Sequence, residues 1–310
     1  MPTVPRRLRR NYDVVHKTDT KPAQLACPGR GPRTGPSPRG TWGMLAPPLW
    51  GARHGDDWGE RMAFATAELT SLRPGASREL NRQVAVGMAV VMFIVNLVGF
   101  GPTFFLRPFF DVPQIPLYLY LHGVVGTAWF ALLVVQAVLI ANRQFTRHRQ
   151  LGWFGVGLAA VIMGLGAYTS THMVPRNAAA HPPLSDADIQ LYSAVTAADL
   201  AGFVVFPTLV ALAIYFRKRA DIHMRLMLIA TMEILGPAFA RIGSWGGVYP
   251  TAIATVTFGL LGVLIIHDLW TRRRIHLATV LGFAFLIGVN AAFQASGVGP
   301  AIVAYRLAHL

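Results

Sequence analysis

Six long stretches of the chain contain no Asp, Glu, Lys or Arg, and they limit the possible folds more than any other feature. These stretches are 83–106, 112–142, 150–175, 200–216, 242–267 and 275–305. A helix needs about 20 mostly apolar residues to cross the hydrocarbon layer of a membrane. Within that layer the backbone hydrogen bonds must be made inside each segment, which favours helices. The sequence therefore predicts an all-α, polytopic transmembrane bundle.

With a further apolar stretch at 224–244, we expect about seven spanning helices. They are predicted near 84–106, 117–141, 150–171, 196–216, 224–244, 249–270 and 277–297. Three of them begin alike, with a basic loop, a histidine and then a long apolar stretch, as internal repeats of membrane folds do. This pattern favours a lone first helix followed by three helical hairpins, 117–171, 196–244 and 249–297. The alternative is that the loops merely share a composition.

The composition agrees with a membrane protein and argues against a nucleic-acid-binding domain. Only 14% of the residues are charged and the mean hydropathy is +0.44, whereas soluble domains carry roughly 25% charged residues. The net charge of +14 is not accompanied by interleaved basic and aromatic residues on a foldable module. We expect the lipid bilayer as a partner and no nucleic acid, and we leave protein partners open.

The basic residues are concentrated in alternate loops. The loops at 142–150, 217–225 and 271–274 are rich in Arg and Lys, whereas those at 107–116, 176–195 and 246–250 are not. Because positively charged loops remain in the cytoplasm, seven crossings place the N-terminus in the cytoplasm and the C-terminus outside. We expect the chain in the inner membrane of a bacterium.

Residues 1–82 differ from the rest of the chain. They hold half of the 28 Lys and Arg residues, are rich in Pro and Gly, and show no apolar period. Such a segment cannot bury enough surface to offset its ordering entropy, so we expect a disordered basic region. Alternatively, the true start is Met44 or Met62. The bundle would then occupy 83–300, with a short tail at 301–310.

Glu233 is the main candidate for a functional residue. It lies near the middle of a predicted span, where a charged group is costly and marks a functional site by default. We expect its carboxyl group to be protonated and hydrogen-bonded to Asn96, Gln136 or Asn290, which lie near mid-depth in their own helices. The Gly236–Pro237 pair follows one turn later and predicts a kink.

Arg241 is a second ionisable residue of the same span. It lies eight residues beyond Glu233, about 12 Å along the helix, and therefore does not pair with it directly. Asp199 lies at a comparable depth near the outer start of the preceding helix. We expect an Asp199–Arg241 ion pair that holds the two helices together.

Five histidines are candidate ligands for a haem or a metal ion. His148, His223 and His276 each follow a basic loop, His267 precedes one, and His122 lies one turn inside the outer end of its helix. Neutral imidazoles on facing helices can hold haem iron or a transition metal. The alternatives are helix caps or lipid-phosphate contacts at the membrane surface, and a proton relay. Haem b is the cofactor that ligation would imply; the sequence otherwise leaves cofactors open. The single cysteine, Cys27, excludes a disulfide framework and a Cys-based metal site.

Two strings, "HGVVGTAWFALLVVQAVLIANRQFTRHRQLGWFG" (122–155) and "DIHMRLMLIAT" (221–231), resemble a bacterial family of predicted multi-pass membrane proteins of unknown function. The His-Arg pair at 148–149 with Gly152, and the His-x-Arg-Leu-Met pattern at 223–227, carry the resemblance. It implies the seven-helix topology and supplies no activity. A bundle with histidines at helix ends is also distantly similar to membrane b-type cytochromes, which would imply haem ligation.

Three functions remain open from the sequence. The first is transport or sensing of a small solute or a proton through Glu233, the second a haem- or metal-dependent redox protein, and the third a membrane scaffold or assembly factor without a ligand. The chain contains no Walker loop, Ser-His-Asp constellation, His-Glu-x-x-His helix or Gly-rich dinucleotide fingerprint. An enzyme of the soluble type is therefore not expected.

Overall fold

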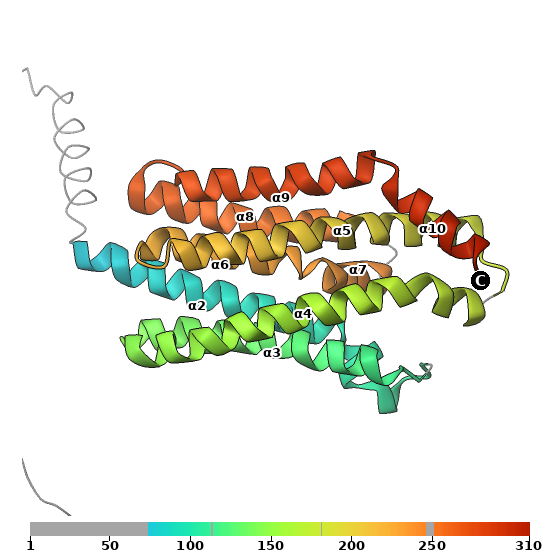
Figure 1. Cartoon of the computed structure of the whole chain (residues 1–310). Coiled ribbons are helices and arrows are strands. Elements are labelled where there is room, and N and C mark those ends of the chain that lie inside the picture. Colours follow the sequence, from blue (N-terminus) through green and yellow to red (C-terminus); the bar gives the residue numbers. More distant parts are fainter. Residues whose placement is uncertain (1–73, 113, 181, 246–250) are drawn as a thin grey trace, which may run out of the picture. The chain divides into compact units, whose positions relative to one another are not determined.

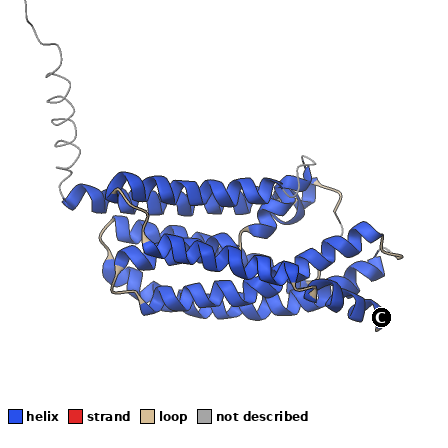
Figure 2. Cartoon of the chain, turned by 90° about the horizontal axis from the view of Figure 1, so that it is seen from above, coloured by secondary structure: helices blue, strands red, loops and turns tan. Residues whose placement is uncertain are grey.

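The computed structural model describes residues 74–310 except 113, 181 and 246–250, all within one compact unit, 58–310. The regular structure of these residues is helical, without a strand (Figure 1, Figure 2). The helices are α2 (Pro74–Gly99), η1 (Gly101–Phe105), η2 (Arg107–Phe109), α3 (Leu117–Ala141), α4 (Phe145–Ala180), α5 (Asp186–Tyr215), α6 (Ala220–Glu233), α7 (Gly236–Trp245), α8 (Thr251–Arg272), α9 (Leu277–Ala295) and α10 (Val298–Ala308). The expected helical bundle is therefore confirmed.

The long helices run side by side, and α5 is at the centre of their contacts. α5 packs against α4, α6, α9 and α10, whereas α3 lies between α2 and α4, and α7 contacts α2 and α8. Figure 1 shows the loops at 142–144, 216–219 and 273–276 at one end of the bundle. The α4–α5 connection and the C-terminus lie at the other end. The three strongly basic loops thus share one end.

The length and composition of the helices suit a membrane. Among the described residues, five helices are long and apolar enough to cross one, and a sixth span results if α6 and α7 count together. Their outward faces carry large hydrophobic side chains, such as Ile94 of α2, which is 51% exposed, and Leu281 of α9, which is 59% exposed. Soluble proteins rarely expose extensive apolar surface of this kind.

A tryptophan joins three helices in the middle of the bundle. Trp129 of α3 is 3% exposed, and its indole Nε1 donates to Thr231 Oγ1 of α6 at 3.1 Å. The ring of Trp129 also meets Phe206 of α5 edge to face, with the ring centres 5.1 Å apart. The indole N–H is therefore satisfied inside an apolar core, as buried tryptophans require.

Helical structure extends beyond the predicted spans at both ends of the bundle sequence. α2 begins at Pro74, so residues 74–82 are helical rather than part of a disordered region. The rest of that prediction, including the starts proposed at Met44 and Met62, lies outside the described residues. The expected tail at 301–310 is mostly helix α10, which turns off α9 at Gly297 in the left-handed region (φ 71°). Gly299 lets α10 approach α5, because a Cβ there would overlap the Ser193 carbonyl.

The predicted 176–195 loop is also largely helical. α4 continues through Pro175 to Ala180, and α5 begins at Asp186. A capping box starts α5: Ser185 Oγ accepts from the Asp188 N–H, and the Asp188 carboxylate accepts from the Ser185 N–H. The reciprocal bonds satisfy helix-end donors. The connection between α4 and α5 is therefore much shorter than the loop predicted at 176–195.

Candidate functional site

The predicted kink at Gly236–Pro237 is a complete break that separates α6 from α7. The two helices are bent by 44° at this break. Pro237 has no N–H and therefore cannot bond to the carbonyl of Glu233, which would be its helical acceptor. The last helical residue of α6 is Glu233 itself. The acidic side chain and the interrupted backbone thus occupy the same place in the bundle.

The Glu233 carboxyl group accepts its hydrogen bonds from one amide. Asn290 Nδ2 of α9 lies 3.1 Å from Glu233 Oε1 and 3.0 Å from Oε2. The same amide donates to the Leu286 carbonyl at 3.0 Å, which fixes its orientation. Gly202 of α5 faces the carboxyl group, since a Cβ there would lie 3.6 Å from Glu233 Oε1. Among the described residues, no ion pair includes Glu233.

Of the three amides expected near Glu233, only Asn290 bonds to it. Asn96 of α2 is 4% exposed, and its Nδ2 has no hydrogen-bond partner among the described residues. Gln136 Oε1 of α3 is likewise buried without a partner in the described part of the chain. A buried amide without a partner usually marks an ordered water molecule or a ligand. The interior of the bundle therefore contains polar groups that its own side chains do not satisfy.

The expected ion pair between Asp199 and Arg241 is not found. No ion pair among the described residues joins them, and Asp199 instead meets Ser170 of α4. Arg241 Nη1 donates to the Pro237 carbonyl at 3.1 Å, and its guanidinium carbon lies 4.4 Å from the centre of the Phe100 ring. Arg241 is thus held by a carbonyl of its own helix and by an aromatic ring, and these contacts take the place of the expected carboxylate.

The five candidate histidines do not form one cluster. His148 and His223 come together with ring centres 6.1 Å apart. His276 caps α9, and its Nε2 lies 3.1 Å from Asp221 Oδ2. His267 lies beside the carboxylate of Asp268, and His122 packs against α4 near Gly166. In the described ranges no group of three or more His, Cys, Asp or Glu is arranged to hold a metal ion.

The His148–His223 pair is built in the same way on both sides. His148 Nδ1 lies 3.3 Å from the Gln136 carbonyl of α3, and His223 Nδ1 lies 2.8 Å from the Ala213 carbonyl of α5. A ring nitrogen that faces a carbonyl carries the proton. When the imidazole is neutral, this leaves Nε2 as the atom with a lone pair. Each histidine thus ties the start of one helix to the preceding helix, in equivalent places of the first two predicted hairpins.

A fully buried ion pair at the same end of the bundle was not expected from the sequence. Arg225 of α6 and Asp268 of α8 are both 0% exposed and form a salt bridge through Nη2 and Oδ1. Asp268 Oδ2 also accepts from Thr279 Oγ1 at 2.8 Å and from the His276 N–H at 3.0 Å, both at the start of α9. Buried charges are stable only when paired and hydrogen-bonded in this way. The network joins α6, α8 and α9.

Asp221 connects this buried network to the surface. Its carboxylate accepts from His276 Nε2 and from Arg272 Nη2, at 3.1 Å and 3.3 Å. Its backbone carbonyl accepts from Arg225 Nη1 at 2.9 Å. The sequence does contain a signal for the network, since Arg225 and Asp268 each lie on the helix side of a basic loop. Pairing them requires knowing that the side chains of these two helix ends come together.

The arrangement can hold a proton at Glu233, two imidazole nitrogens at His148 and His223, and a rigid charged junction at Arg225 and Asp268. No protein-family model matches the chain, and no curated protein or solved structure is significantly similar to it.

Proposed function

We propose that the chain is an integral membrane protein that moves or senses a proton, alone or together with a small solute, through Glu233. The observation that carries the proposal is the position of this carboxyl group at the break between α6 and α7, where its hydrogen bonds come from the Asn290 amide. Carboxyl groups inside membrane bundles mark proton and ion pathways. Broken helices likewise surround the binding sites of many transporters.

The membrane location in this proposal is supported by the apolar outer faces and by the separation of charge along the bundle. We propose seven crossings, with α6 and α7 as one bent span and α8 as another. The end that carries the loops at 142–144, 216–219 and 273–276 would face the cytoplasm, because positively charged loops remain there. The C-terminus would then lie on the outer side of a bacterial inner membrane.

The chemistry proposed for Glu233 is the uptake and release of a proton. The ionised carboxylate accepts from Asn290, whereas the protonated group loses its charge and gains an O–H donor. Next to it, Pro237 leaves the Glu233 carbonyl without its helical donor. A change of protonation therefore changes the hydrogen bonding of the segment that connects two half-helices. Such a segment can take up a second arrangement at modest cost.

The proposal is tested by the variant Glu233→Gln, which keeps the shape of the side chain and removes the titration. In proteoliposomes with an entrapped pH-sensitive dye, the wild type should pass or bind protons under an imposed pH gradient. Infrared difference spectra should show a protonated carboxyl band that titrates. Both signals should be lost in Glu233→Gln.

Glu79→Gln is the matched control, because Glu79 lies on the exposed surface of α2 and pairs with Arg82. It should retain both signals. Equal signals from Glu233→Gln and the wild type would contradict the proposal and would favour a scaffold without a ligand.

A second candidate function rests on the pair His148 and His223. Both Nδ1 atoms face backbone carbonyls, so both Nε2 atoms are available as ligands. Imidazole nitrogen is an axial ligand of haem iron and a common ligand of transition metals. If the protein binds haem b or a metal ion, its absorption or metal content after purification should fall when either histidine is replaced by Ala.

A further inference from the structure

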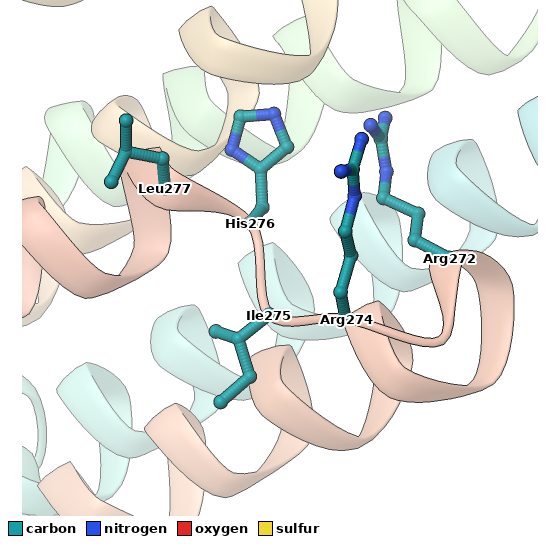
Figure 3. A pocket seen from close by; sticks show the side chains of 5 residues that line it. All are labelled: Arg272, Arg274, Ile275, His276 and Leu277. Carbon is teal, nitrogen blue, oxygen red and sulfur yellow. The ribbon is translucent and has the colours of Figure 1, made fainter.

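The loop between α8 and α9 places two arginines on one side of a tight turn. α8 ends at Arg272, and the next residue, Arg273, adopts the left-handed region with φ 56°. This turn brings the side chains of Arg272 and Arg274 next to each other, as Figure 3 shows. The imidazole of His276 extends from the same side of the loop, and Ile275 points away from it.

The side chains of Arg272, Arg274 and His276 line a pocket of about 280 Å³. Ile275 and Leu277 complete its lining. Small-molecule sites in proteins occupy roughly 300–1,000 Å³, so the pocket suits a small group rather than an extended ligand. Its polar lining consists of two guanidinium groups and one imidazole. The apolar side chains beside the pocket are exposed, Ile275 by 41% and Leu277 by 66%.

The pocket has more positive charge than its neighbours neutralise. Among the described residues, Asp221 is the acidic group that pairs with its side chains, and the Asp221 carboxylate is shared between Arg272 Nη2 at 3.3 Å and His276 Nε2 at 3.1 Å. Arg274 is exposed and makes no hydrogen bond or ion pair with the described residues. His276 Nδ1 accepts from the Ala278 N–H at 3.0 Å, so its Nε2 carries the proton that faces Asp221. Of the two adjacent guanidinium groups, that of Arg272 is therefore paired with the Asp221 carboxylate, whereas that of Arg274 has no counter-charge among the described residues.

We propose that this pocket binds a phosphate group, with Arg272 and Arg274 as the donors. A guanidinium group is planar and donates two parallel hydrogen bonds to phosphate oxygens. A tetrahedral anion between the two side chains would neutralise the charge that Asp221 leaves uncompensated. The phosphate group belongs either to an anionic lipid headgroup, whose acyl chains would meet Ile275 and Leu277, or to free phosphate. The lipid source rests on the proposed membrane location, whereas the phosphate chemistry does not.

The test compares Arg274→Gln with Arg273→Gln in the purified full-length protein in detergent micelles. Both variants remove one positive charge from the same loop, but only Arg274 lines the pocket. The ligands are dioleoylphosphatidylglycerol, dioleoylglycerol, which has the same acyl chains without phosphate, and sodium phosphate. Dissociation constants come from the rise in melting temperature with ligand concentration. Without ligand, both variants should melt like the wild type, because neither the Arg273 nor the Arg274 side chain makes a hydrogen bond or ion pair with the described residues.

We expect dioleoylglycerol to have no effect on any variant. The dissociation constant for a phosphate-bearing ligand should rise about tenfold in Arg274→Gln, since a charged hydrogen-bonded pair is lost. In Arg273→Gln it should stay within about twofold of the wild type. Stabilisation by phosphatidylglycerol alone would assign the group to a lipid headgroup, and stabilisation by sodium phosphate as well would show that free phosphate suffices. Equal losses in both variants, or no stabilisation by either phosphate ligand, would overturn the proposal.

Discussion

Arg225 and Asp268 are both fully buried, and each depends on the other for its charge to be tolerated there. Removing water from two charges costs several kcal/mol per ion, which their contact and the bonds from Thr279 and His276 offset. The pair therefore contributes more to the specificity of helix packing than to the net stability of the fold. It fixes α6, α8 and the start of α9 in one register, because a shift of any of the three would separate a buried charge from its partner.

Breaking this pair on one side should be costly. Arg225→Met leaves the Asp268 carboxylate buried without its cation, and we expect a loss of about 3–5 kcal/mol in unfolding free energy. The double variant Arg225→Met/Asp268→Leu removes both charges and should lose clearly less than the sum of the two single variants. Denaturation in mixed detergent micelles measures all three. Additive losses would show that the two charges do not interact.

For single residues, the sequence predicts position best where depth in the bundle follows from counting residues along one helix. Glu233 and Asn290 were both expected near mid-depth, and the structure brings them into contact. Asp268 was missed because it lies two residues before the end of the predicted span 249–270, where its position along the helix does not indicate a buried partner. α8 continues to Arg272, which places Asp268 one turn inside the helix. Its partner lies 43 residues away, and such a pairing depends on tertiary contacts that one sequence does not reveal.

Among the elements, α3 matches its predicted bounds of 117–141 at both ends. Pro116 precedes its first residue and Arg143 closes the uncharged stretch after it, so local chemistry marks both limits. α4 does not match, since it continues past Arg176 to Ala180. The prediction limited this helix to 150–171, about the length of one membrane crossing. Arg176 does not interrupt the helix, whose backbone hydrogen bonds continue beyond that length. The break at Gly236–Pro237 was foreseen as a kink, though not as two separate helices.

The contact between α2 and α7 depends on a single missing side chain. A Cβ at Gly99 would lie 2.6 Å from the Ala238 carbonyl oxygen and 2.7 Å from the Ala238 Cα, and backbone atoms cannot move aside cheaply. We therefore expect Gly99→Ala to lower the unfolding free energy by about 1–3 kcal/mol, as overpacking does. At Gly87 of the same helix, by contrast, an added Cβ would meet nothing within 4 Å.

Gly87→Ala is the matched control, and it should leave stability unchanged or raise it by up to about 1 kcal/mol, because Ala favours the helix. The melting temperatures of both purified variants decide the question. Similar values for Gly99→Ala and Gly87→Ala would mean that α7 does not approach α2 as closely as the structure shows.

For the molecule as a whole, the separation of charge between the two ends of the bundle makes a topological prediction. We propose that the α5–α6 loop faces the cytoplasm and the C-terminus faces outward. In a Cys27→Ser background, Lys218→Cys should resist a membrane-impermeant maleimide in intact cells, and His309→Cys should react. Both positions are exposed, so access depends only on the side of the membrane. Labelling of both or of neither would contradict seven crossings in this orientation.

The structure also has a consequence for how α4 and α5 are held together. α10 packs onto both helices, and Arg306 Nη1 donates to the Thr171 carbonyl of α4. α10 thus braces the end of the bundle at which α4 connects to α5. A variant without residues 297–310 would lose this brace, and we expect the two helices to splay apart there.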